Sequence, residues 1–167
     1  MISEPKLEDR AAIPYVAIRA QVTMGEMPTL PKLWDEVAGW LGSKGIAPVG
    51  AWFWRYRIVD MTNKLEVDVG IPLAAPVKGE GRIIADTIPA GRYVTMIYTG
   101  PFEGDGLMKA TESLLKWADK NGIQWDKWPS GATGEGWAAR IENYWTDPAQ
   151  QPDPQKYETE LAFKTVS

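Results

Sequence analysis

The chain has 167 residues, a formal net charge of -4 and a sequence pI near 5.0. It contains neither cysteine nor histidine, which excludes disulfides, thiol nucleophiles and the commonest general base and metal ligand. An acidic chain without a basic stripe is not suited to bind a phosphate backbone, so we expect no direct nucleic-acid partner. Any chemistry has to use carboxylates, hydroxyls, amines or water, and we expect no cofactor and no metal.

The length suffices for one substantial core and is too short for two ordinary domains, so we expect a single domain over residues 1–167. The N-terminal stretch MISEPKLEDRAAIP has acids and a proline where a secretion signal would have a long apolar run. No segment reaches the roughly 18 apolar residues of a membrane span. The sequence therefore predicts a cytoplasmic protein without a membrane partner.

The first half of the chain predicts a strand, an amphipathic helix and two further strands, over residues 15–22, 28–45, 51–61 and 65–73. In the helix, apolar residues recur at helical spacing. Thr29 is expected to cap its start and Gly45 to close its end.

The second half predicts the same order, over residues 92–102, 107–122, 136–147 and 156–166. Each helix has a tryptophan five residues before a Gly-Ile pair, and each first strand opens with Tyr-Val. An internal duplication explains this repetition, with modules at about 13–73 and 88–166. We expect an α+β fold built from a tandem β-α-β-β module, with antiparallel sheets, helices on the outer faces and a ligand groove between the modules.

The strand predicted over residues 136–147 contains an unexpected carboxylate, Glu142. Because side chains alternate along a strand, Ile141 shares one face with other apolar residues, which we expect to cover the helix. Glu142 and Tyr144 then point together into the groove. Matching Asp60 with Asp147 in the other module places Arg55 opposite Glu142.

A second interpretation is that this face is solvated and that Glu142 pairs with Arg55 or Arg140. Such a surface ion pair contributes about 0–1 kcal/mol. The nine tryptophans form either a dense aromatic core or an aromatic-lined pocket. Positions in helices or on core faces favour packing for four of them, namely Trp34, Trp40, Trp117 and Trp145, and leave the other five open.

Three segments, YTGPF (98–102), LEVDVGIPL (65–73) and ENYWTDP…PDPQKYETEL (142–161), resemble the GyrI-like small-molecule-binding domain. That family includes the effector-binding halves of multidrug-responsive transcription regulators. The resemblance covers about residues 13–166, and the Glu-x-Tyr-x-x-Asp-Pro pattern is its most specific part. No helix-turn-helix segment precedes the domain in this sequence, so we expect the free-standing kind.

The resemblance implies that Glu142 is the family's buried pocket glutamate and Tyr144 its neighbouring aromatic residue. The ligand-binding residues are then expected to be Phe53, Trp54, Arg55, Tyr98, Phe102, Trp137, Glu142 and Tyr144. The leading function is binding of hydrophobic or amphipathic small molecules in xenobiotic tolerance or sensing. The pair of Arg55 and Arg57 is less familiar in a cation binder.

Two alternatives remain open. Some free-standing members resemble hydrolases of strained electrophilic small molecules, in which Glu142 and Tyr144 would be the catalytic residues. A protein partner, as in an inhibitor, is suggested only by analogy with the family. Turnover of a reactive compound would distinguish the hydrolase from a pure binder.

Overall fold

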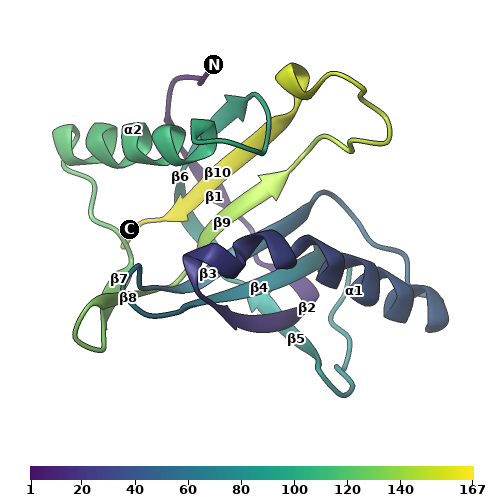
Figure 1. Ribbon diagram of the computed structural model, residues 1–167. Helices are drawn as coiled ribbons and strands as arrows, with labels where there is room; N and C mark the ends of the chain where they lie inside the picture. Colours follow the sequence, from purple (N-terminus) through teal and green to yellow (C-terminus); the bar gives the residue numbers. More distant parts are fainter.

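The computed structural model describes residues 1–167 as one antiparallel sheet with two α-helices lying against it (Figure 1). The helices are α1 (Pro31–Ser43) and α2 (Gly106–Lys120), and two 3-10 turns, η1 (Met24–Thr29) and η2 (Pro154–Lys156), precede α1 and β10. The strands are β1 (Lys6–Arg10), β2 (Ile13–Val22), β3 (Trp52–Val59), β4 (Leu65–Pro72), β5 (Ile83–Ile88), β6 (Gly91–Thr99), β7 (Lys127–Ser130), β8 (Gly134–Trp137), β9 (Arg140–Tyr144) and β10 (Glu158–Lys164). No helix is long and apolar enough to cross a membrane.

The strands follow the order β1-β6-β10-β9-β3-β4-β2-β5, and the small hairpin of β7 and β8 attaches to β3. Along the chain, the order strand, helix, strand, strand occurs twice, as β2-α1-β3-β4 and as β6-α2-β9-β10. The two halves meet where β3 lies beside β9. Outward from this pair, β4 and then β2 follow on one side, and β10 and then β6 follow on the other. The architecture is therefore mostly antiparallel sheet with few helices, and the origin of its halves by duplication stays a prediction.

The helices end at glycine and begin without a side-chain cap. Gly45 and Gly122 have φ values of 67° and 68°, in the left-handed region that glycine adopts most easily. The predicted cap at Thr29 is wrong, because its hydroxyl donates to the carbonyl of Glu26 within η1. Helix α1 instead starts with Pro31, whose fixed φ suits the first helical position and which has no N–H to satisfy.

Both helices cover the same face of the sheet. One row of laterally paired residues crosses this face from β6 to β2: Met96, Leu161, Glu142, Trp54, Val69 and Ile18. Helix α2 packs over the Met96 and Leu161 end through Leu114. Helix α1 packs over the Ile18 end through Val37 and Leu41. Glu142 and Trp54 therefore lie in the middle of the row, between the two helices.

We expected the helices on the outer faces and the groove on the other side of the sheet. This row shows instead that Glu142 lies on the same face as both helices. The prediction assumed that the apolar residue Ile141 has to face a helix. Ile141 instead belongs to a second core on the opposite face, together with Tyr15, Phe53 and Tyr93. In this core Tyr15 of β2 packs with Tyr93 of β6, although the two strands lie near opposite ends of the sheet. The sheet therefore curls toward this face.

The strand predicted over residues 136–147 is interrupted at Ala138 and Ala139, between β8 and β9. The interruption changes which face the side chains take. Trp137 therefore does not share a face with Ile141, as alternation predicts, but packs against Phe163 on the side covered by α2.

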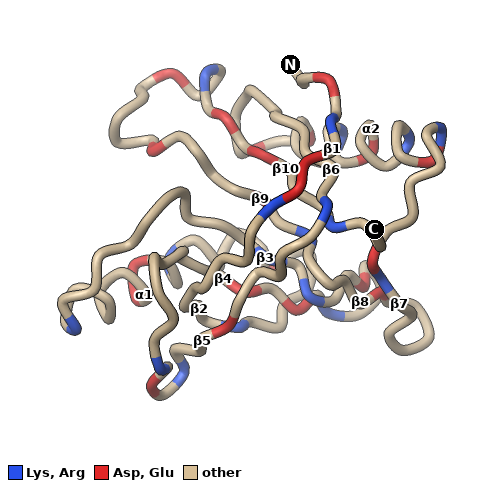
Figure 2. Tube along the Cα trace, turned by 180° about the vertical axis from the view of Figure 1, so that it is seen from behind, with Lys and Arg blue, Asp and Glu red and all other residues tan.

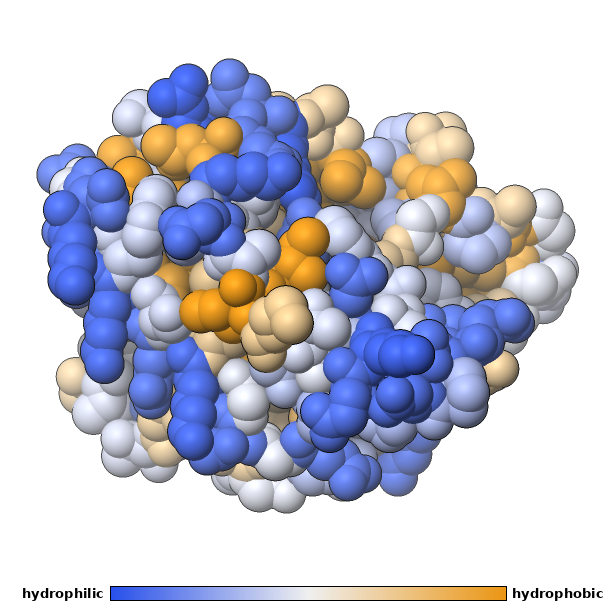
Figure 3. Space-filling model, turned by 90° about the horizontal axis from the view of Figure 1, so that it is seen from above, coloured by the Kyte–Doolittle hydropathy of each residue, from blue (hydrophilic) through white to orange (hydrophobic).

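Acidic and basic residues are interspersed along the whole trace (Figure 2). Seen from above, exposed apolar side chains form small patches separated by hydrophilic residues (Figure 3). Met108 and Trp145 are among the large apolar side chains that remain exposed. An isolated exposed apolar residue such as Met108 is ordinary on a protein surface, whereas Trp145 belongs to the wall of a cavity.

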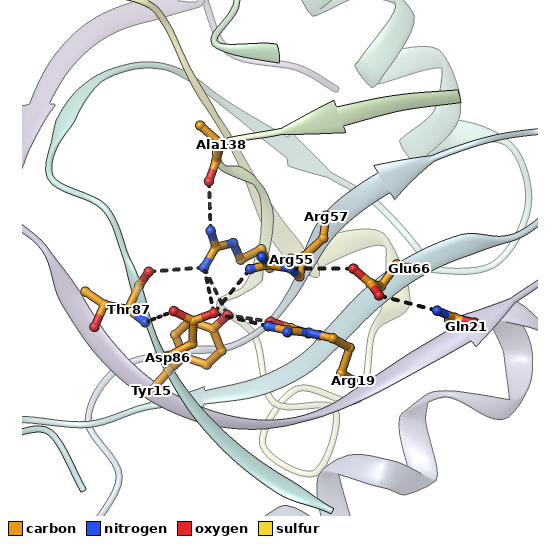
Figure 4. Close-up of polar contacts among 10 residues, drawn as sticks. Tyr15, Arg19, Gln21, Arg55, Arg57, Glu66, Asp86, Thr87 and Ala138 are labelled. Carbon is orange, nitrogen blue, oxygen red and sulfur yellow. Dashed lines mark hydrogen bonds and ion pairs between the residues drawn. The ribbon is translucent and has the colours of Figure 1, made fainter. Parts of the chain in front are cut away.

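The opposite face of the sheet carries a buried network of charged residues (Figure 4). Asp68 on β4 is fully buried and accepts hydrogen bonds from the Tyr15 hydroxyl at 2.5 Å and from Nε of Arg19 at 2.7 Å. Arg55 on β3 donates to the Tyr15 hydroxyl at 3.0 Å and to the carbonyl of Ala138 at 2.8 Å. Arg55 thus holds the interruption between β8 and β9 in place.

We expect Asp68→Asn to lower the free energy of unfolding by about 3 kcal/mol or more. The substitution removes the negative charge to which Tyr15 and Arg19 donate hydrogen bonds. Glu66→Gln on the same strand is the control. Glu66 is partly exposed and lies 3.6 Å from Nε of Arg57, so its loss should cost about 1 kcal/mol or less. Urea unfolding of both variants measures the difference, and equal effects would contradict a central role for Asp68.

Candidate functional site

A cavity of about 610 Å³ lies between α1 and α2, above the central strands β3 and β9. Aromatic residues from α1, β3 and β9 and from the loops that follow β6 and β9 dominate its wall: Trp34, Trp52, Trp54, Phe102, Tyr144 and Trp145. Leu107 and Pro31 at the starts of the two helices add apolar surface, and Asp147 is the one charged residue of the lining. A large, mostly apolar hollow with few polar groups is typical of a small-molecule site.

Tyr144 lies at the centre of the aromatic cluster. Its ring meets those of Trp34, Trp54 and Phe102 edge-on, at centroid distances of 5.3, 5.5 and 5.4 Å. Trp34 and Trp54 stack on each other at 5.5 Å with an angle of 21° between their planes. Edge-on and offset contacts are the favoured geometries for aromatic rings, so the cluster is well packed.

Trp34 is held by the backbone of the sheet below it. Its indole N–H is shared between the carbonyls of Gly70 at 3.1 Å and Phe53 at 3.3 Å. Gly70 cannot carry a side chain without disturbance, because a Cβ there would lie 2.5 Å from the Phe53 ring on the opposite face. In contrast, the buried Nε1 of Trp54 has no hydrogen-bond partner. The tryptophan from the helix is therefore fixed, and the tryptophan from the strand is held by packing alone.

Glu142 lies directly beneath Tyr144 and is 7% exposed. Its Oε1 accepts hydrogen bonds from the Tyr144 hydroxyl at 2.5 Å and from the Tyr56 hydroxyl at 3.1 Å. Burial raises the pKa of Glu142, while the two hydroxyls and the charge of Arg140 oppose this rise. Burial and the nearby carboxylate also raise the pKa of both tyrosines well above the usual value, so the hydroxyls remain donors.

The expected site residues fall into three places. Trp54, Phe102 and Tyr144 line the cavity, and Glu142 lies behind Tyr144. Tyr98 and Trp137 are buried in the core beneath α2. Phe53 and Arg55 lie on the opposite face of the sheet, so the predicted position of Arg55 opposite Glu142 is wrong.

A shift of one residue explains the misplaced pair. In the structure Glu142 pairs with Trp54, and Arg55 pairs with Ile141. Matching Asp60 with Asp147 moved β3 by one position, and a slip of one residue exchanges every side chain between the two faces of a strand. The interpretation of Glu142 as part of a surface ion pair also fails, because it is buried and makes no ion pair with Arg55 or Arg140.

Several residues of the site were not identified from the sequence as ligand contacts. The assignment of Trp145 to packing is wrong, because it is exposed and lines the cavity. Trp34 was assigned to packing because its helical spacing matched that of the core residues, and it does both. Trp52 and Tyr56 share the face of Trp54 at strand spacing, and this alternation in WFWRY was the available signal.

These features define a class of protein: a curled antiparallel sheet with two helices on one face and an aromatic cavity between them. The sequence model of the GyrI-like small molecule binding domain matches residues 3–165, and the chain belongs to that family. No curated protein matches the sequence.

Several solved structures share the fold. The chain resembles EcmrR in a complex with DNA (TM-score 0.79, 22% identity), covering 97% of this chain and 57% of that one. It therefore spans little more than half the length of that protein. The C-terminal domain of EcmrR alone matches with a TM-score of 0.73 and 21% identity over 98% of each chain.

Two more distant structures share the fold. SAV2435 bound to tetraphenylphosphonium matches with a TM-score of 0.63 and 12% identity, over 99% of this chain and 95% of that one. A structure described as a hydrolase from Listeria innocua matches with a TM-score of 0.60 and 14% identity, over 98% and 92%. At these identities the likeness establishes the fold.

The raised pKa of Glu142 has a consequence for stability. The folded state holds this proton more tightly than the unfolded state, so ionising Glu142 costs stability as the pH rises above the usual carboxyl range. We expect Glu142→Gln, which cannot ionise, to raise the melting temperature relative to the parent at pH 8 and to lose this advantage near pH 4. Thermal unfolding across that range measures the difference, and a variant that is less stable at pH 8 would contradict the burial argument.

Proposed function

We propose that this chain binds hydrophobic or amphipathic aromatic small molecules in the cavity between α1 and α2, in tolerance or sensing of foreign compounds. The observation that carries the proposal is the cavity itself, about 610 Å³ with tryptophans on its walls and a carboxylate beneath its floor. A volume of this size is within the range of drug-sized ligands. The family's description as a small molecule binding domain supports the same reading.

Tyr144 separates an incoming ligand from the carboxylate. A neutral aromatic compound can stack against Trp34 and Trp54 with Tyr144 in place. A cation has to move Tyr144 aside, exchanging its hydrogen bond for a direct contact with Glu142. Aromatic rings around a cation add about 0.5–2 kcal/mol each through cation–π attraction. The tetraphenylphosphonium in SAV2435 is a ligand of this kind, which supports the cationic class.

The reservation about Arg55 and Arg57 does not apply to this cavity. Arg55 belongs to the network on the opposite face, and Arg57 pairs there with Asp86 at 3.2 Å. Neither residue lines the cavity. The carboxylates of Glu142 and Asp147 are therefore the acidic groups nearest to a ligand.

The second candidate is a cofactor-independent hydrolase that opens strained electrophilic compounds. The pair of Glu142 and Tyr144 favours it, because burial raises the pKa of Glu142 toward the range of a general base. In this reaction a water oxygen bonds to the electrophilic carbon while Glu142 accepts the water proton. The leaving atom takes the bonding electron pair and a proton from Tyr144, which regains one from Glu142 along their hydrogen bond.

Binding is tested with aromatic compounds of matched shape that are neutral or cationic. We expect saturable quenching of tryptophan fluorescence at micromolar concentrations, since 1 μM corresponds to about -8.2 kcal/mol. Trp54→Leu should weaken binding about 10-fold or more, because it removes one stacking wall of the cavity. Trp40→Leu is the control, since Trp40 lies outside the cavity and donates to Glu80. The proposal fails if no compound quenches saturably or if both variants lose affinity equally.

The role of the carboxylate is tested with Glu142→Gln. In a binder, this variant should lose about 1–3 kcal/mol of affinity for cations, the scale of a charged hydrogen bond, and keep its affinity for neutral compounds. In a hydrolase, turnover should fall by a factor of about 10² to 10⁴, with a smaller loss in Tyr144→Phe. Calorimetry and product analysis with a strained electrophile distinguish the two. A pure binder converts at most one molecule of the electrophile per protein molecule, whereas a hydrolase converts many. Equal losses for neutral and cationic ligands, without turnover, would refute both roles.

A further inference from the structure

Arg140 on β9 is a half-buried cation for which the protein supplies no acceptor. It lies two residues before Glu142, on the helix-bearing face of the strand. The structure gives its guanidinium neither a hydrogen bond nor an ion pair. Arginine has five N–H donors, and leaving them unpaired in a partly desolvated place is costly. Burial lowers the pKa of Arg140 accordingly.

Aromatic rings surround the guanidinium instead of carboxylates. Its Cζ lies 4.8 Å from the ring centroid of Phe163, 5.0 Å from that of Trp137 and 5.9 Å from that of Tyr56. These contacts stabilise the charge over the ring faces and fix the side chain. The N–H groups of the guanidinium point outward in its plane, where a carboxylate or phosphate oxygen would accept them. The aromatic rings offer no such oxygen, so these donors stay without a hydrogen bond.

The nearby acids do not pair with Arg140. Oε1 of Glu142 accepts from two tyrosine hydroxyls, and Glu135 pairs with Lys127. The contrast with Arg55 is informative, since Arg55 donates to a hydroxyl and to two backbone carbonyls. Arg55 also has a fully buried, unpartnered Nε, whereas no nitrogen of Arg140 is fully buried. The donors of Arg140 are therefore both unpaired and reachable from solvent.

We propose that Arg140 is an anion-binding residue, which takes a carboxylate or phosphate oxyanion on the free edge of its ring-stacked guanidinium. A planar fork held by three rings is preorganised for two-point contact with an oxyanion. The rings of Phe163 and Trp137 are buried, whereas Tyr56 is partly exposed, so an aromatic carboxylate or phosphate has the ring of Tyr56 alone to pack against. This site is separate from the cavity between the helices, whose lining does not include Arg140, and it does not depend on the proposed function.

The test uses the full chain labelled with ¹⁵N-arginine and follows the side-chain Nε–Hε resonance of Arg140, assigned by its absence in Arg140→Met. Acetate and inorganic phosphate are titrated against sodium chloride of equal ionic strength. We expect a saturable shift with both oxyanions and none with chloride. Benzoate and phenyl phosphate form the second arm, and binding at least 10-fold tighter than acetate or inorganic phosphate assigns the oxyanion to an aromatic ligand rather than to a free anion.

Calorimetry with the same anions gives the matched comparison of variants. Arg140→Met should weaken binding about 10-fold or more, the effect of a charged hydrogen bond, and Arg140→Lys should recover part of it through a single-point contact. Arg57→Met, on the opposite face, should bind like the parent. Melting curves in phosphate and in chloride provide a readout if a variant is unstable, because phosphate should raise the melting temperature of the parent and not of Arg140→Met. The proposal is overturned if the parent shift follows ionic strength alone or if Arg140→Met binds the oxyanions as the parent does.

Discussion

The pairing of β3 with β9 is the contact on which the rest of the structure depends. It joins the two halves of the chain into one sheet and sets Trp54 directly opposite Glu142. The strands outward from this pair, as far as β6 and β2, continue the same row, and the helices at the two ends of the row leave its middle uncovered. The cavity is thus a result of topology: two helices cannot cover the centre of a sheet whose halves meet there.

The uncovered centre is chemically unusual because it combines aromatic rings with a buried acid. Glu142 has tyrosine hydroxyls as its hydrogen-bond partners and no counter-ion, which is a costly environment for a carboxylate. Arg140 nearby is a cation without an acceptor. These two opposite charges lie two residues apart on one strand and do not pair with each other. A structural ion pair would have satisfied both at once.

Sequence reasoning predicted the order strand, helix, strand, strand in both halves, the antiparallel character and the family, because periodicity and the Glu-x-Tyr-x-x-Asp-Pro pattern are local signals. It did not predict β1, β5 and β7. It identified Glu142 and Tyr144 as neighbours on one face, and the structure places them in contact. It misplaced Arg55 because the register between distant strands is set by tertiary pairing, and a single-residue slip reverses the face. The interruption at Ala138 could not be foreseen for the same reason, since the Arg55 side chain that holds it comes from another strand.

The faces of the sheet are also linked through Gly70. Its carbonyl holds Trp34 above the sheet, and the Phe53 ring occupies the space below it where a side chain would stand. Substitution at this position would move a wall of the cavity and the opposite core together. The walls are therefore poor places for evolution to adjust ligand preference. A change at Phe102 in the β6–α2 loop would instead alter the rim of the cavity without disturbing the sheet.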